Sequence, residues 1–364
     1  MYIVIFTSFV AILLTYLESR NKIVGGMKWG FIFLTLLGCI HYDYGNDYLG
    51  YLDIYNNITK YPFDLELVLS GELFKEPGWA IFCYLFKHFG GFFMMVAVLS
   101  VIQNILLYKI IKEYVEKRWW PLSVLVYVCF SELYLLSFSM MRQSFVIFVF
   151  LGIWPLIEKR KCILASVILF LCSTIHSSAL VLLPFAFFGY LPVRRSKLWA
   201  WSFIIFYLAI WFGGTFINTV FSSFMYIEQF SDYAETYGDS SERVTFGIGF
   251  LLNQIPFILS LLYLLDDNNK TQIDKKLVVL SIISFVIIPF STIVPLVGRI
   301  GMYFVAFQVV AIPKVYASIN NVSLRYIAFF ILIFMTLYSY FAFFNNPLWT
   351  PKYTIFKTIF PHVF

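Results

Sequence analysis

The stretch SFSMMRQSFVIF, residues 137–148, places the cationic side chain of Arg142 directly before a run of apolar residues. That run continues to Ile157, and similar runs recur along the whole chain. Of the 364 residues, 61% are hydrophobic and 13% are charged, and the mean hydropathy is +0.82. Soluble domains carry about 25% charged residues. The composition therefore predicts a membrane protein.

The apolar runs approach the length of a membrane-spanning helix, about 20 residues. We predict an all-α, polytopic integral membrane protein that forms a single multi-pass domain over residues 1–364 and has about twelve transmembrane helices. The expected cores of these helices are 2–17, 28–41, 91–111, 119–138, 143–157, 162–175, 178–191, 198–216, 246–265, 277–293, 298–313 and 323–344. Residues 78–88 are too few to cross the membrane and are a candidate re-entrant half-helix.

The basic residues predict how the chain is oriented. Lysine and arginine are enriched in cytoplasmic loops, and with the N-terminus outside, most of them fall in the predicted inward turns. Two longer segments, about 42–78 and 217–245, then face outward; both are acidic and rich in tyrosine. This asymmetry accounts for the net charge of +6 and argues against nucleic acid as a partner.

A few ionisable residues lie where a membrane disfavours them. Arg142 and Arg299 interrupt apolar runs, and a charge inside a span costs at least a few kcal/mol, so it is expected to be paired or functional. Both arginines, and His176 in STIHSSALVLLP, fall at outward ends of predicted spans. The alternatives are arginines that extend to the lipid headgroups, an ion pair of Arg142 with Glu132, and a structural histidine.

Carboxylates in the first outward segment could join these groups. Asp47 lies in the turn of HYDYGNDYLGYLDIY, and Glu76 precedes the Pro-Gly of FKEPGWAIF. A solvated acidic loop is the alternative for each. Arginines bind phosphate with planar forks, and a carboxylate or an imidazole can accept a hydroxyl proton. Together with tyrosine and tryptophan, these residues predict a site for a diphosphate and a sugar.

Neither a metal nor another cofactor is expected. The five cysteines lie in apolar stretches without the spacing of zinc ligands or of a disulfide framework. No DxD-type carboxylate pair stands in a plausible site.

In order along the chain, five motifs resemble the EpsG family of Wzy-like bacterial polysaccharide polymerases: GNDYLGY (45–51), EPGW (76–79), SFSMMRQ (137–143), IHSSALVLLP (175–184) and GRIGMYF (298–304). The resemblance covers nearly the whole chain. Members are taken to lengthen O-antigen, capsule or exopolysaccharide chains from repeat units on undecaprenyl diphosphate. The resemblance thus implies a multi-pass glycosyltransferase of the bacterial cytoplasmic membrane with its site on the outer face, and a flippase and a chain-length regulator as candidate partners.

The family pattern Arg-x-x-x-Gly-x-Asp in the first outward loop is matched by Gly45 and Asp47, whereas His41 stands in place of the arginine. A histidine is mostly neutral near pH 7 and cannot act as a bidentate fork, so the role of position 41 stays open. The pair Arg142-Gln143 also matches the family pattern.

These residues divide into expected roles. Arg142 and Arg299, with Arg243 as a further candidate, stabilise the departing diphosphate, and Asp47, His176 or Glu76 is the base. The expected substrate contacts also include Gln143, His41, Tyr48 and Tyr303. The rival functions are a lipid-linked oligosaccharide flippase or other transporter, an O-antigen-ligase-type transferase, and a membrane acyltransferase.

Overall fold

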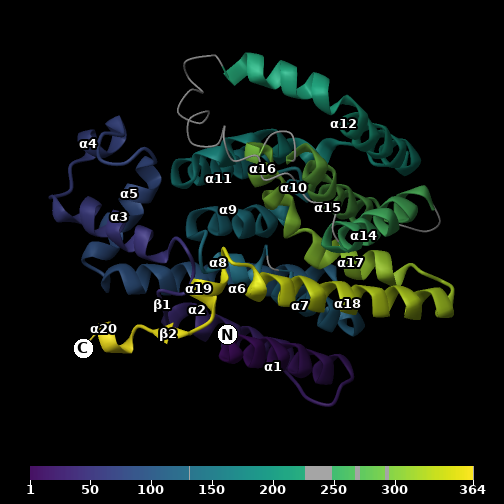
Figure 1. Ribbon diagram of the computed structural model, residues 1–364, viewed down its shortest axis with the longest axis horizontal. Helices are drawn as coiled ribbons and strands as arrows, with labels where there is room; N and C mark the ends of the chain where they lie inside the picture. Colours follow the sequence, from purple (N-terminus) through teal and green to yellow (C-terminus); the bar gives the residue numbers. More distant parts are fainter. Residues whose placement is uncertain (131, 226–247, 267–270, 292–294, 364) are drawn as a thin grey trace. The chain divides into compact units, whose positions relative to one another are not determined.

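The computed structural model describes residues 1–364 except 131, 226–247, 267–270, 292–294 and 364, and this described part is predominantly helical (Figure 1). It forms two compact units. The first unit comprises residues 1–191 and 336–364, and the second comprises residues 192–335.

The first unit contains α1 (Tyr2–Ser19), α2 (Gly26–Ile40), β1 (His41–Tyr42), α3 (Tyr48–Lys60), α4 (Leu65–Ser70), α5 (Pro77–Lys87), α6 (Gly91–Tyr114), η1 (Lys117–Trp119), α7 (Trp120–Cys129), α8 (Tyr134–Ser137), α9 (Met141–Gly152), α10 (Trp154–Glu158), α11 (Cys162–Ile175), the 3₁₀ helix η2 (Ser177–Tyr190), α19 (Thr350–Tyr353), β2 (Lys357–Thr358) and α20 (Phe360–Val363). The helix α18 (Val322–Asn345) contributes its C-terminal part to this unit.

A helical hairpin places two of the predicted site residues at one end of the first unit. Helices α9 and α10 together form an apolar segment from Met141 to Glu158, and α11 returns after a turn in which Arg160 has a φ of +57°. Because the chain reverses at this turn, the start of α9 and the end of α11 lie at the same end of the hairpin. Arg142 and His176 occupy these positions.

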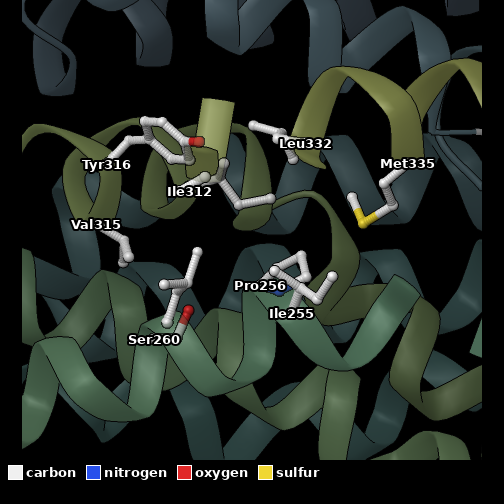
Figure 2. Close-up of a pocket in the computed structure, with 10 residues that line it drawn as sticks. Ile255, Pro256, Ser260, Ile312, Val315, Tyr316, Leu332 and Met335 are labelled. Atoms are coloured by element: carbon white, nitrogen blue, oxygen red, sulfur yellow. The ribbon is translucent and has the colours of Figure 1, made fainter. Parts of the chain in front are cut away.

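The second unit contains α12 (Ser196–Met225), α14 (Ile248–Leu265), α15 (Gln272–Ser291), α16 (Pro295–Val305), α17 (Gln308–Ala317) and the N-terminal part of α18. A narrow cavity lies between α14, α17 and α18, with room for about one water molecule, ≈ 10 Å³ (Figure 2). Its lining is mostly aliphatic and includes no charged side chain. This cavity is therefore not a candidate for binding a diphosphate.

The architecture agrees with an all-α membrane protein, with the addition of one short antiparallel pair, β1 and β2. In the described part, five helices are long and apolar enough to cross a membrane, or six if α16 and α17, which are bent by 57°, count as one span. The remaining expected spans and the single multi-pass domain stay predictions.

Several expected elements differ in detail from the structure. The expected span 119–138 is interrupted, since α7 ends at Cys129 and α8 begins at Tyr134. Residues 177–190 form a 3₁₀ helix that contains Pro184. Residues 42–78, which were expected to form an outward loop, contain the helices α3 and α4. The candidate half-helix is a helix of 11 residues, α5.

Candidate functional site

The carboxylate of Glu76 is the centre of a cluster in the first unit. Glu76 occupies the N-cap position of α5, where Pro77 begins the helix, but its side chain makes no capping hydrogen bond there. Instead its Oε1 accepts the backbone N–H of Ser177, the first residue of η2, at 2.9 Å. A carboxylate at a helix N-terminus is favourable because unpaired N–H groups point toward it.

Arg142 forms an ion pair with this carboxylate. Its Nη1 donates to Oε2 of Glu76. The arginine side chain is 19% exposed and that of Glu76 is 9% exposed. Removing one partner of such a buried pair leaves an uncompensated charge, which typically costs about 3–5 kcal/mol.

Three aromatic rings surround the same guanidinium. Its Cζ lies 5.4 Å from the ring centre of Tyr51, 5.2 Å from that of Phe74 and 5.9 Å from that of Trp79. Cation–π attraction at these distances favours the charged arginine. The apolar rings also lower the local dielectric around the guanidinium, which strengthens its interaction with an anion.

His176 is the third member of the cluster. It follows the last residue of α11, and its Nδ1 lies 3.5 Å from Oε1 of Glu76. Gly78 in the first turn of α5 makes this approach possible. A Cβ at position 78 would lie 2.1 Å from Oγ1 and 2.9 Å from the backbone carbon of Thr174, two residues before His176. Only a glycine allows α5 to pack this closely on α11.

Asp47 is attached to the segment that leads into α9. Its N–H donates to Oγ of Ser139 at 3.2 Å, and the Ser139 hydroxyl donates to Oδ2 of Asp47 at 3.0 Å. The turn approaches this segment closely because Gly45 has a φ of +125° and a Cβ there would lie 2.4 Å from the carbonyl oxygen of Phe138. Asp47 is thereby bonded to a residue that lies three positions before Arg142 in the sequence.

His41 and Tyr48 are buried under this turn. The Nδ1 of His41 lies 2.7 Å from the carbonyl oxygen of Gly38, and its ring packs edge-on against Tyr48 and Phe138. Tyr48 donates its hydroxyl to the backbone oxygen of His41 at 3.2 Å. Their expected contact with substrate stays a prediction.

The other predicted site residues fall into three groups. Gln143 is buried in α9 beside Arg142. Arg299 and Tyr303 lie on α16 in the second unit, where Arg299 is half-buried and Tyr303 is buried. Arg243 and most of the expected loop 217–245 lie outside the described residues. The structure thus brings together Arg142, His176 and Glu76.

The cluster combines two chemical capacities. The carboxylate and the imidazole can exchange a proton, and the guanidinium can bind an anion. The Nε of Arg142 is buried and has no hydrogen-bond partner in the described part of the chain.

Sequence reasoning did not single out Ser139 or the ring of Phe74. Ser139 lies inside the motif that contains Arg142, but a serine in an apolar run is more often bonded to its own backbone.

The EpsG family model matches residues 29–357, which include all members of the cluster. No curated protein and no solved structure matches the chain. The family match extends over nearly the whole chain and both units. The chain therefore belongs to the EpsG family, a family of Wzy-like polysaccharide polymerases.

Proposed function

We propose that this protein is a membrane glycosyltransferase that joins oligosaccharide repeat units, carried on undecaprenyl diphosphate, into a surface polysaccharide at the outer face of the cytoplasmic membrane. The observation that carries the proposal is the Glu76 carboxylate held between Arg142 and His176. This cluster lies in a chain of a polymerase family, and it offers an anion-binding cation beside a base.

In the proposed reaction, a hydroxyl group of the incoming unit attacks the anomeric carbon of the sugar that joins the growing chain to its lipid. The new glycosidic bond forms as the bond from that carbon to the diphosphate breaks. The bonding electrons leave with undecaprenyl diphosphate, and Arg142 stabilises the negative charge that develops. The diphosphate is already an activated leaving group, so we propose that no metal is needed.

The hydroxyl proton passes to the cluster. We propose His176 as the base, because a neighbouring carboxylate orients an imidazole and stabilises its cation. Glu76 is within reach of His176 for that role. Asp47 is the alternative base, and its hydrogen bond to Ser139 supports this assignment less directly.

Further residues outside the Glu76 cluster are proposed as substrate contacts. Arg299 and Arg243 are proposed to bind the diphosphate, and Gln143, Tyr48, His41 and Tyr303 to contact substrate. A flippase that supplies the repeat units and a chain-length regulator are the proposed partners.

The test is polymerisation by the purified protein. The full chain in lipid nanodiscs, supplied with lipid-linked repeat units and EDTA, should convert them into a ladder of longer products on a gel. Arg142→Ala should abolish the ladder. The control Arg118→Ala should not, since Arg118 is exposed and pairs with Glu116. A ladder that survives Arg142→Ala, or one that requires added Mg²⁺ or Mn²⁺, would contradict the mechanism.

The same preparation tests the rival transporter. In proteoliposomes, a flippase would expose labelled repeat units to an impermeant reagent without lengthening them. That result, with no ladder from the unmodified protein, would replace the proposed function.

A further inference from the structure

The C-terminal segment, residues 346–359, returns to residues 41–47, at the start of the expected first outward loop. Its strand β2 pairs antiparallel with β1, so that Tyr42 lies opposite Lys357. The next backbone N–H bond continues this pairing, because Ile359 donates to the carbonyl oxygen of Ile40 at 2.9 Å. Residues near the C-terminus thus pair with β1, which directly precedes the turn that carries Asp47 in the sequence, and Figure 1 shows β1 and β2 side by side.

Two lysines of this segment hold one carboxylate of the loop. Lys352 donates to Oδ1 of Asp43 at 2.6 Å, and Lys357 donates to Oδ2 at 2.8 Å. The Asp43 side chain is only 10% exposed. Burial alone would raise the pKa of Asp43, but the hydrogen bonds and charges of both lysines outweigh burial and lower it. Asp43 is therefore charged at neutral pH.

The backbone at Asp43 is held in an unusual conformation. Its φ is +46°, in the left-handed region that residues other than glycine rarely adopt, although aspartate and asparagine tolerate it best. The chain reverses here between β1 and the turn at Gly45. The two lysines are thus bonded to the residue where the loop changes direction.

Two hydrogen bonds between uncharged groups also attach residues 346–359 to the chain next to Asp47 and to the chain before Ser139. Asn46 donates its amide to the carbonyl oxygen of Leu348 at 2.9 Å. The Tyr353 hydroxyl donates to the carbonyl oxygen of Leu135 at 2.9 Å. The segment therefore touches the turn and the stretch that leads to Arg142 at the same time.

We propose that residues 346–359 form a clamp that fixes the first outward loop against the start of α9, and that Asp43 is the positioning residue through which the clamp acts. The clamp keeps Asp47 bonded to Ser139. It also fixes the direction in which α3 starts, and this direction brings the ring of Tyr51 to Arg142. The expected effect of the clamp on turnover rests on the proposed function, whereas its expected effect on the order of the loop is independent of that function.

The test removes the charge of Asp43, to which both lysines of the clamp are bonded, without altering the backbone preference at position 43. Asp43→Asn keeps a residue that tolerates positive φ and leaves the Tyr353 and Asn46 contacts in place. The matched control is Asp53→Asn, since Asp53 is exposed on α3. The first readout is hydrogen–deuterium exchange of the peptide covering residues 41–48, on the full chain in nanodiscs. The second is the turnover number and the KM for lipid-linked repeat units.

We expect Asp43→Asn to speed exchange of the loop by roughly tenfold, the size of effect typical for losing hydrogen bonds to a charged group. Turnover should fall by a similar factor while KM changes less, because the Asp43 side chain itself bonds to Lys352 and Lys357 and not to substrate. Asp53→Asn should change neither quantity. Exchange equal to that of the unmodified protein would overturn the clamp, whatever the protein polymerises.

A covalent substitute separates positioning from general stability. Tyr42 and Lys357 face each other across an antiparallel pair, where Cα atoms lie about 4.5–5.5 Å apart, close enough for a disulfide. Adding Tyr42→Cys and Lys357→Cys to Asp43→Asn should restore slow exchange and turnover, and a reductant should reverse both. Slow exchange restored without turnover would refute the positioning role. If the unmodified protein makes no polymer, the proposed function fails, and exchange alone decides the clamp.

Discussion

Arg142 is a permanent cation at the start of an apolar helix, and its surroundings explain how the fold tolerates it. The carboxylate of Glu76 neutralises its charge, and the rings of Tyr51, Phe74 and Trp79 enclose the guanidinium. Replacing a buried ion pair by apolar residues is often neutral or stabilising. Stability alone therefore does not require an arginine here, and a function for its charge is the stronger explanation.

At the residue scale, Arg142→Lys tests whether the fork of the guanidinium matters. Lysine keeps the charge but loses the planar set of donors that matches a phosphate. We expect turnover to fall by about a hundredfold to a thousandfold, the usual cost of one lost transition-state contact. The measurement is polymer length on a gel from cells that lack their own polymerase, with a blot for the variant. Arg299→Lys should give the same result.

Arg118→Lys is the control for that experiment, because this exposed side chain pairs with Glu116, which is exposed as well. Long polymers from Arg142→Lys would refute the phosphate fork. Loss of the protein itself would show that the Arg142–Glu76 pair is structural, and Glu76→Gln should then reduce the protein level in the same way.

At the scale of elements, the contact between α5 and α11 assembles the cluster. Glu76 and His176 are separated by a hundred residues of sequence, and they meet because Gly78 lets the first turn of α5 rest on the last turn of α11. The distance between Glu76 and His176 thus depends on Gly78, which is not itself ionisable.

Gly78→Ala should therefore impair the site without touching its ionisable groups. The added methyl group would lie 2.9 Å from a backbone carbon of Thr174, so the helices must move apart. Overpacking of this kind typically costs about 1–3 kcal/mol, and we expect a lower melting temperature and a loss of polymerisation. Gly50→Ala in α3 is the control, because a Cβ there meets no atom within 4 Å. Full activity of Gly78→Ala would show that this close approach is unimportant.

The same elements show how far the sequence could predict this fold. The apolar runs located α6 and α11 to within a few residues, and charge placement put Arg142 and His176 at one end of their hairpin. The sequence does not predict the break after Cys129. Because α7 is buried on nearly all sides, its sequence has no periodic polar face that would mark where the helix ends.

Contacts between residues that are far apart in the sequence could not be predicted from the sequence either. Arg142 was expected to pair with Glu132 if its role were structural, yet it contacts Glu76, 66 positions earlier. Asp43 and Lys352 are 309 positions apart. Local spacing carries no information about such contacts, since they depend on how whole helices pack.

At the scale of the whole molecule, the orientation in the membrane decides which compartment the cluster faces. From Arg142 to the basic turn at 159–161, the chain rises by about 27 Å if it is helical throughout, close to the thickness of a hydrocarbon core, about 30 Å. The two ends of this hairpin should therefore lie on opposite sides of the membrane. Lysine and arginine in the turn predict that this end is cytoplasmic, and the cluster is then predicted to face outward.

Cysteine labelling tests this orientation. After replacement of the five native cysteines, Asn57→Cys reports on the side of the cluster, because Asn57 is exposed on α3, the helix whose Tyr51 lies against Arg142. Lys161→Cys reports on the basic turn. An impermeant thiol reagent should label position 57 in intact cells and position 161 only after permeabilisation. The reverse pattern would place the cluster in the cytoplasm, where it could not extend a polymer assembled outside, and would remove the basis for polymerisation at the outer face.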